Sequence, residues 1–187
     1  QYSTTAALYT CDELTPDLCD LHVTNGTLLV RGLRLNYWTY EAPQWLVDCM
    51  VSDCITTTRE APPIIMVHGG PGWSHDYMLP LKQQACRGRK VIFYDQVGAG
   101  VSERPASASA TAPWLLTVEY YVEELQAVAD ALVGSGPFHV IGSSWGTVVA
   151  QEYALQAPPV GPELLSLVLS GPLSDGQLYI NSQWDEV

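Results

Sequence analysis

The chain has 187 residues, of which 20 are acidic and 8 are basic, so its formal net charge is −12. This balance excludes a typical nucleic-acid-binding protein, which needs clustered Lys and Arg to replace phosphate counterions, and it disfavours binding to an anionic membrane surface. Hydrophobic residues make up 47% of the chain and charged residues 15%, which is typical of a globular core. The length suits a single domain. No apolar run reaches the roughly 18 residues that a bilayer-spanning helix needs.

The first segment, residues 1–27, is irregular and polar, and it carries signs of a secreted protein. The sequence begins with Gln1 and not with Met, as expected after removal of a signal peptide; an arbitrary starting point is the alternative. Asn25 lies in an Asn-Gly-Thr sequon for glycosylation. These features predict a secreted, extracellular protein, or one in a vacuolar or lysosomal type of compartment.

Five cysteines favour the same compartment. Four of them form two close pairs, Cys11 with Cys19 and Cys49 with Cys54, and the fifth is Cys86. A metal site is disfavoured because no His or further Cys lies at zinc-finger spacing, so we predict disulfides. The two local pairings are the simplest of the three connectivities that four cysteines allow. Cys86 is then either a buried thiol or the partner of a cysteine outside this chain.

The first predicted elements are strands. Residues 28–30 and 33–40 carry apolar, β-branched and aromatic side chains around Arg31-Gly32, which predicts a hairpin. Residues 41–62 contain two cysteines between prolines and predict a disulfide-stapled insertion. The run 64–67 is wholly apolar and stops at glycines, which suits a strand buried on both faces of a parallel sheet.

The same pattern continues towards the carboxyl end. Three more apolar runs end near glycines, and each predicts a strand: residues 91–94, 138–141 and 165–169. Residues 118–133 have helical apolar spacing between Thr117 and Gly134 as caps, and a further helix is predicted from Trp145 to about Gln156. Alternating strands and helices predict an α/β fold with a mostly parallel sheet, whose ligand site lies at the carboxyl ends of the strands.

One motif carries chemistry. Residues 142–146, Gly-Ser-Ser-Trp-Gly, fit G-x-S-x-G and lie between a predicted strand and a predicted helix, as this motif requires. Ser144 is expected in a strained turn with positive φ that exposes its hydroxyl, and the flanking glycines let strand and helix cross closely. The Trp145 N–H is then available to a developing oxyanion at the helix N-terminus. A bare match is common by chance, but the strand-turn-helix context favours a nucleophilic serine.

A second glycine loop follows the first buried strand, at residues 68–72, His-Gly-Gly-Pro-Gly. Glycines there let the backbone approach a substrate carbonyl, and Gly70 is the predicted second oxyanion donor. An ordinary Gly-Pro turn is the alternative, but it explains poorly why two such loops end two buried strands.

Three stretches resemble the signature loops of the proline iminopeptidase family of α/β-hydrolases: residues 68–77, His-Gly-Gly-Pro-Gly-Trp-Ser-His-Asp-Tyr, residues 94–102, Tyr-Asp-Gln-Val-Gly-Ala-Gly-Val-Ser, and residues 142–146. The resemblance covers roughly residues 28–180. The resemblance implies Ser144 as the nucleophile, Gly70 and Trp145 as the oxyanion hole, and a structural turn at Asp95 to Ser102. That family removes N-terminal residues from peptides, often proline, and related members hydrolyse amides and esters. No cofactor or metal is expected. Residues 1–27 and 41–62 depart from the usual start of the family.

The chain contains no candidate for the general base of a catalytic triad, because the triad residues of this fold follow one another along the chain in the order Ser, then Asp or Glu, then His. All four His precede Ser144. His139 is expected to be a wall residue of its strand, a catalytic His68 or His75 would break the order, and His22 lies in the irregular start. We therefore expect residues 28–187 to be the N-terminal part of a hydrolase domain, with 171–187 leading into a cap.

The final predicted strand, residues 164–169, would expose an unpaired edge. We expect the triad acid and base, and the cap, to come from a C-terminal segment or a second chain, either after processing into a heterodimer or because the sequence is a fragment. Cys86 is a possible covalent tie.

Three functions fit these observations. The first is a secreted serine aminopeptidase of proline iminopeptidase type, acting on peptides through an acyl-enzyme. The second is an esterase or amidase acting on small substrates. The third is a non-catalytic protein that binds a glycan or protein ligand on a hydrolase fold; the intact Ser144 argues against it, because a strained serine without catalysis has only a cost.

Overall fold

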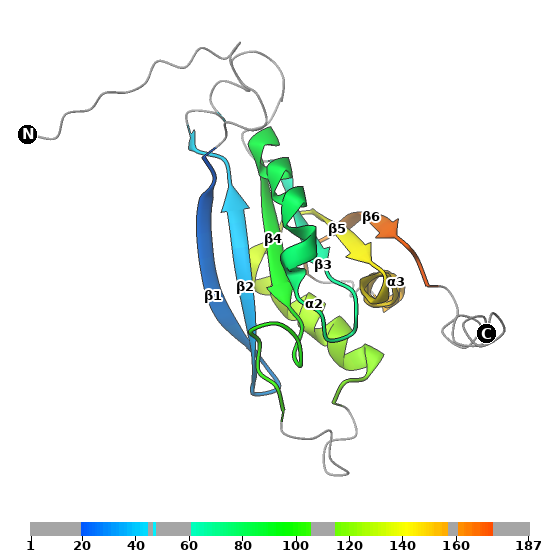
Figure 1. The fold of residues 1–187 in the computed structure, drawn as a ribbon. Coiled ribbons are helices and arrows are strands. Elements are labelled where there is room, and N and C mark those ends of the chain that lie inside the picture. Colours follow the sequence, from blue (N-terminus) through cyan, green and yellow to red (C-terminus); the bar gives the residue numbers. More distant parts are fainter. Residues whose placement is uncertain (1–19, 45–46, 48–60, 106–114, 157–160, 174–187) are drawn as a thin grey trace, which may run out of the picture.

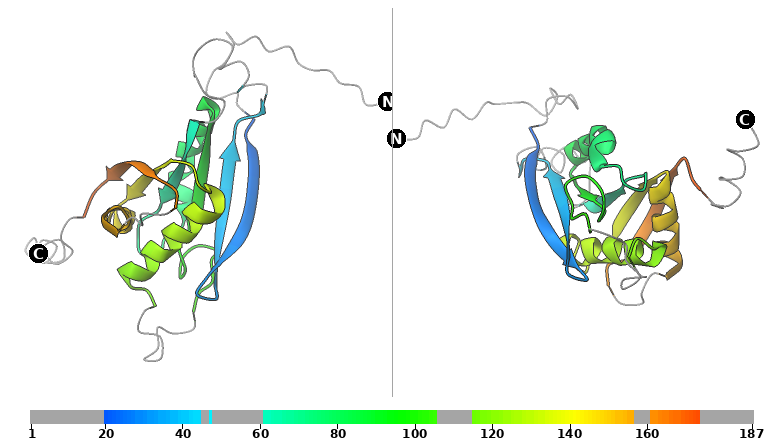
Figure 2. Two further views of the ribbon diagram at one scale, coloured as in Figure 1. Left: turned by 180° about the vertical axis from the view of Figure 1, so that it is seen from behind. Right: turned by 60° about the horizontal axis from the view of Figure 1, so that its bottom comes forward.

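The computed structural model describes residues 20–44, 47, 61–105, 115–156 and 161–173. Its elements are β1 (His22–Val30), β2 (Leu33–Glu41), β3 (Ala61–Val67), the 3₁₀-helix η3 (His75–Arg87), β4 (Arg89–Asp95), α2 (Val118–Leu132), β5 (Phe138–Ser143), α3 (Trp145–Gln156) and β6 (Leu164–Ser170). In this part of the chain, one sheet runs in the order β1-β2-β4-β3-β5-β6 (Figure 1). Helices α2 and α3 cover one face and η3 the other (Figure 2), which confirms the predicted α/β class.

The predicted hairpin is confirmed, but it is longer than expected. Strands β1 and β2 pair antiparallel from His22 opposite Glu41 to Val30 opposite Leu33. Between them Arg31 and Gly32 have φ values of 48° and 85°, a two-residue turn whose twist matches that of the strands. Residues 22–27 therefore belong to β1 and not to an irregular segment. Their polar side chains are mostly exposed, which an edge strand tolerates and which hid the strand in the sequence.

Both ends of the predicted insertion at 41–62 belong to strands of the sheet. Glu41 closes β2, and Ala61 and Pro62 open β3. The pairing of β3 with β4 is irregular between Ala61 and Ile64, where two prolines lack the N–H that a ladder needs. The middle of the insertion, residues 45–46 and 48–60, lies outside the described residues.

The four apolar runs form the parallel part of the sheet, as predicted. β3 pairs parallel with both β4 and β5, and β5 pairs parallel with β6. Ile65, Met66 and Val67 of the central strand β3 are inaccessible to solvent, as a strand covered on both faces requires. Because parallel strands end at one edge, the loops after β3, β4 and β5 meet there.

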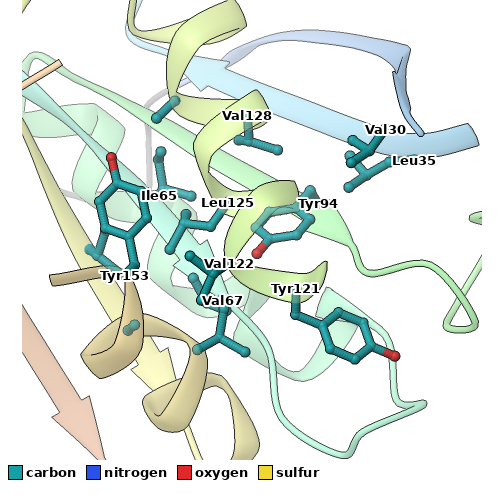
Figure 3. Packing of buried hydrophobic residues seen from close by; sticks show 14 of the residues in the cluster. Val30, Leu35, Ile65, Val67, Tyr94, Tyr121, Val122, Leu125, Val128 and Tyr153 are labelled. Carbon is teal, nitrogen blue, oxygen red and sulfur yellow. The ribbon is translucent and has the colours of Figure 1, made fainter. Parts of the chain in front are cut away.

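Helix α2 contributes more buried side chains than α3 to the core on their shared face of the sheet. Thr117 caps its start by accepting a hydrogen bond from the Tyr120 N–H at 3.2 Å, and Gly134 follows its end with φ 79°. Figure 3 shows side chains of α2 interleaved with those of the sheet: Val122, Leu125 and Val128 with Ile65, Val67 and Tyr94. Packing between α2 and the sheet, which the apolar spacing predicted, thus holds the site's supporting strands in place.

Helix η3, on the opposite face, has no counterpart among the sequence predictions. It contains Pro80, ends at Gly88 with φ 76°, and buries only three of its side chains, His75, Met78 and Ala85. Met78, Leu81 and Ala85 do stand at helical spacing, but Pro80 lies inside this run and hid the helix from the sequence pattern.

Strand β6 is the last strand of the sheet in the described residues, with β5 as its neighbour on one side. Leu165 and Val168 remain 46% and 51% exposed, and Leu155 of α3 is 81% exposed. Among the described residues, the expected open edge with uncovered apolar side chains is therefore present. Of the predicted lead-in at 171–187, residues 174–187 lie outside the described part.

Candidate active site

Ser144 lies at the junction of β5 and α3 and has the geometry that the motif predicts. Its φ is 50°, in the left-handed region, and its side chain is exposed. The Ser144 N–H donates to the Ser170 carbonyl of β6 at 2.9 Å, and the Ser144 carbonyl accepts from the Thr147 N–H at 2.8 Å. These bonds hold a strained turn that presents the hydroxyl at the carboxyl edge of the sheet.

The two motif glycines permit the crossing of α3 over β3. A Cβ added at Gly146 would stand 2.1 Å from the Val67 carbonyl oxygen and 2.7 Å from that of His68. A Cβ at Gly142 would stand 2.6 Å from the Gly146 carbonyl oxygen. Both are far below contact distance, so no larger residue fits at either position.

The loop after β3 packs directly against Ser144. A Cβ added at Gly69 would stand 2.8 Å from the Ser143 carbonyl oxygen and 2.9 Å from the Ser144 Cβ. Gly70 has φ 126°, which requires glycine. The structure thus brings together the loops of Gly70 and Ser144–Trp145; the role of the Gly70 and Trp145 N–H groups as oxyanion donors stays a prediction.

Tyr77 is the last residue of the first loop of the resemblance, and it is a neighbour of the site to which the sequence analysis gave no role. Its hydroxyl accepts a hydrogen bond from the Gly69 N–H at 2.7 Å, and its ring meets Trp73 edge to face at a centroid distance of 6.0 Å. Tyr77 is 43% exposed and Trp73 is 68% exposed. The two rings form an aromatic rim beside Ser144. Their place directly after the glycine loop was the only sequence signal for this rim.

The loop from Asp95 to Ser102 is a hydrogen-bonded turn, as the resemblance implied. The Val101 N–H donates to Asp95 Oδ2 at 3.0 Å, and the Asn36 N–H of β2 donates to Ser102 Oγ at 2.8 Å. A Cβ at Gly100 would stand 1.9 Å from Asp95 Oδ2, so the carboxylate fills the space that glycine leaves. The turn is thereby fixed to the end of β4.

A buried His-Asp pair anchors η3 to this turn. Asp95 Oδ1 accepts from the backbone N–H of His75 at 3.0 Å and from its Nδ1 at 2.8 Å. Burial acts to raise the pKa of Asp95, but hydrogen bonds from His75 and Val101 outweigh it and lower that pKa. The His75 ring stacks on Trp38 at 4.1 Å. Its polar and aromatic partners give it a structural role, in line with the expectation that it is not the base.

His68 is also fully engaged. Its Nε2 accepts from the Gln96 N–H at 3.0 Å, so the ring proton lies on Nδ1 and is donated to the Gly69 carbonyl at 2.8 Å. Burial lowers the pKa of His68, which favours this neutral form. With both nitrogens occupied, His68 cannot take a proton from Ser144.

The two other histidines lie on strands. His139 of β5 has Nδ1 2.8 Å from Ser166 Oγ of β6, and its pKa is lowered by burial and by Arg89. It is a wall residue between two strands, as expected. His22 is exposed at the start of β1.

Glu124 of α2 is a buried acid that sequence reasoning also missed. It is inaccessible to solvent, its Oε1 accepts from the Val97 N–H at 3.0 Å, and its Oε2 has no hydrogen-bond partner. Burial raises the pKa of Glu124 to about 8, against opposing hydrogen bonds from Val97 and Tyr120. It is therefore mostly protonated at neutral pH, under the loop that follows β4.

Other predicted features fall partly outside the described residues. Asn25 of the sequon is exposed on β1, and Cys86 is partly buried in η3. Cys11, Cys19, Cys49 and Cys54 lie outside the described part, so their pairing stays a prediction. Within the described ranges, no group of His, Cys, Asp and Glu is arranged to hold a metal ion. Among the described helices, none has the length and apolar character to cross a bilayer.

Curated relatives are similar to this chain over its hydrolase part. A proline iminopeptidase of Lactobacillus helveticus is 40% identical over 121 residues, which are 64% of this chain and 39% of that protein. A proline iminopeptidase of Thermoplasma volcanium is 38% identical, over 65% of this chain and 38% of its own length. A proline iminopeptidase of Lactobacillus delbrueckii subsp. lactis is 36% identical, over 72% of this chain and 43% of its own length. The chain thus spans about two fifths of the curated relatives it matches.

Solved structures share the fold. VinJ superposes with a TM-score of 0.60 at 27% identity, over 78% of this chain and 43% of VinJ. A proline iminopeptidase-related protein from Thermus thermophilus gives a TM-score of 0.59 at 20% identity, over 89% of this chain and 57% of that protein. The family described as alpha/beta hydrolase fold matches residues 62–186, which contain all three loops of the site. The chain therefore belongs to the α/β-hydrolase fold family and is similar, within it, to the proline iminopeptidases.

Proposed function

We propose that this chain supplies the nucleophile and the oxyanion loops of a serine hydrolase that removes N-terminal residues from peptides. The observation that carries the proposal is Ser144, exposed at φ 50° with the Gly69 backbone against its Cβ. A non-catalytic protein has no use for this strain. The named relatives, all proline iminopeptidases, support the reaction type.

The proposed reaction has two steps. Ser144 Oγ attacks the carbonyl carbon of the first peptide bond while a base takes its proton, and the N–H groups of Gly70 and Trp145 bind the oxyanion. The C–N bond breaks, the proton passes to the leaving amine, and an acyl-enzyme remains on Ser144. Water, deprotonated by the same base, then releases the N-terminal residue as a free acid and restores the Ser144 hydroxyl.

The base and its orienting acid are proposed to come from outside this chain's described residues. His68 and His75 have partners that occupy them, and His139 contacts Ser166. The open edge of β6, with Leu165 and Val168 exposed, would pair with a further strand. We therefore assign the acid, the base and the cap to a C-terminal segment or to a second, processed chain.

Covalent labelling tests the proposal. A fluorophosphonate should react with Ser144 of the native protein, with loss of fluoride and transfer of the hydroxyl proton to the base. Ser144→Ala should abolish labelling, and Ser143→Ala, which changes the neighbouring serine of the same motif, should retain it. A folded native protein that is not labelled would exclude a serine hydrolase.

Substrate choice separates the peptidase from an esterase or amidase. An aminopeptidase should hydrolyse aminoacyl amides with a free α-amino group and lose at least about 100-fold in kcat/KM, roughly 3 kcal/mol, when that amine is acetylated. Equal rates on free and acetylated substrates would favour the small-substrate hydrolase. A series of N-terminal residues including proline would then define the preference.

We also propose that the protein is secreted, disulfide-bonded and glycosylated. Exposure of Asn25 on the edge strand makes the sequon accessible to modification. Release of mass by an N-glycosidase, lost on Asn25→Gln, would test the glycan. Masses before and after reduction would test the disulfides and a second chain tied through Cys86; an unchanged single mass would refute that tie.

A further inference from the structure

Gln96 lies between the two loops that meet at Ser144. It follows β4 directly and is 1% exposed. Strand β4 is separated from β5 by β3, so Gln96 reaches across the end of β3 to contact the start of α3. Its position makes it a neighbour of both candidate oxyanion loops.

Three hydrogen bonds join Gln96 to these loops. Its backbone N–H donates to His68 Nε2 at 3.0 Å, and its side-chain Nε2 donates to the His68 carbonyl at 2.8 Å. Its Oε1 accepts from the Trp145 indole Nε1 at 3.1 Å. The first two bonds hold the loop after β3, and the third holds the loop after β5.

The chemistry of the partners permits one orientation of the amide. The indole N–H of Trp145 can only donate, so it must face Oε1, and the His68 carbonyl can only accept, so it must face Nε2. A glutamate at position 96 would lack the donor for His68. A leucine of similar size would lack both bonds.

The two loops must be held in register for the proposed reaction. An oxyanion is stabilised only when both donors lie about 3 Å from the place where the charge develops, and small displacements cost much of the effect. Close packing of Gly146 on the Val67 and His68 carbonyls sets how near the loops can come. It supplies contact without an attractive polar link.

We infer that Gln96 is a positioning residue that ties the Trp145 side of the oxyanion site to the His68–Gly70 side. The inference rests on the proposed function. It predicts that loss of the tie slows acylation of Ser144 and leaves substrate binding unchanged. A residue that only satisfies buried polar groups would change stability alone.

The test uses the full native protein and four variants. Gln96→Leu removes the tie, Trp145→Phe removes only the indole N–H and keeps the backbone N–H, and a third variant combines the two changes. Gln126→Leu makes the same substitution on the exposed face of α2, where Gln126 Nε2 donates to Asp130 at 2.7 Å. The readouts are the second-order rate of fluorophosphonate labelling, kcat and KM on an aminoacyl amide, and the thermal midpoint.

Gln96→Leu should label at least about tenfold more slowly and lower kcat with KM within about twofold, whereas Gln126→Leu should match the wild type. Trp145→Phe should share the loss, and the double variant should be no slower than the slower single variant, because both changes break the same bond. Should Gln96→Leu fail to fold, Trp145→Phe carries the test, since it deletes one bond and keeps an aromatic ring.

Three outcomes distinguish failure of the inference from failure of the proposed function. A labelled wild type with an equally labelled, folded Gln96→Leu or Trp145→Phe would overturn the inference and leave the proposed function intact. Fully additive losses in the double variant would also overturn it. An unlabelled wild type would remove the proposed function and this inference together.

Discussion

The clearest stability prediction concerns Glu124, the buried acid of α2. Glu124→Gln keeps the shape of the side chain and an oxygen that can accept from the Val97 N–H, but it cannot ionise. Burial raises the pKa of Glu124 from 4.5 to about 8, so the folded protein holds this proton where the unfolded chain has released it. The neutral acid makes its whole contribution to the free energy of unfolding below pH 4.5, and this contribution is lost as the pH rises through about 8.

The size of the loss follows from that difference. Each pH unit between the two pKa values changes the free energy of unfolding by about 1.4 kcal/mol, so the whole interval costs on the order of 5 kcal/mol. At about pH 5 the variant and the wild type should differ by less than about 1 kcal/mol, because glutamine and a protonated glutamate present similar groups. At about pH 9 the variant should be more stable by several kcal/mol, since glutamine stays neutral.

Urea unfolding at about pH 5, 7 and 9 measures this difference. Glu119→Gln is the matched control, because Glu119 is a more accessible acid in the first turn of the same helix. Its difference from the wild type should stay within about 0.5 kcal/mol at every pH. Parallel pH curves for Glu124→Gln and the wild type would refute the assignment of Glu124 as a buried, neutral acid.

Two further substitutions test the geometry around the site. Gly146→Ala places a Cβ 2.1 Å from the Val67 carbonyl oxygen and should destabilise the protein by about 3 kcal/mol or more in thermal or urea unfolding, whereas Gly136→Ala, with open space around it, should be near neutral. Asp95→Asn can keep one acceptor oxygen for His75, but it removes the negative charge and turns the oxygen that accepts from the Val101 N–H into an NH2 donor, which should cost about 2–3 kcal/mol at about pH 7. Because the pKa of Asp95 is lowered, the wild type's advantage should shrink as the pH falls below about 4, and a constant difference would contradict the role given to this carboxylate.

The strands that carry the site were predictable because burial dictates their composition. Runs such as 64–67 are apolar on both faces, and glycines mark where each run stops. The start of β1 could not be predicted, because residues 22–27 lie on an edge strand where polar side chains are tolerated. Helix η3 was missed because Pro80 interrupts it and only three of its side chains, His75, Met78 and Ala85, are buried.

The residues of the site likewise fall into two groups, those that a local sequence motif predicts and those that depend on contacts between distant parts of the chain. Ser144 and its glycines are dictated by a local crossing of strand and helix, so a five-residue motif predicts them. Gln96 and Trp145 are 49 positions apart, and their hydrogen bond exists only because β3 brings the two loops to one edge. Glu124 reads as an ordinary polar position of a helix until the Val97 loop is found over it.

Three consecutive residues, the last of β4 and the two that follow it, link the layers of the fold. Asp95 holds His75 of η3, Gln96 holds His68 and Trp145, and the Val97 backbone contacts α2 through the Glu124 carboxyl and the Tyr121 hydroxyl. Ionisation of Glu124, whose Oε2 has no hydrogen-bond partner, would therefore disturb the segment that carries Gln96.

This arrangement predicts a coupling between Glu124 and Ser144. The rate of fluorophosphonate labelling in the wild type, divided by that in Glu124→Gln, should fall as the pH rises from neutral through the Glu124 pKa of about 8. The ratio cancels titration of the base, which both proteins share. Glu119→Gln should keep a constant ratio to the wild type. If the Glu124→Gln ratio is also constant while the stability difference develops as expected, the turn after β4 stabilises the fold without positioning Ser144, because ionisation would then change folding and leave the labelling rate unchanged.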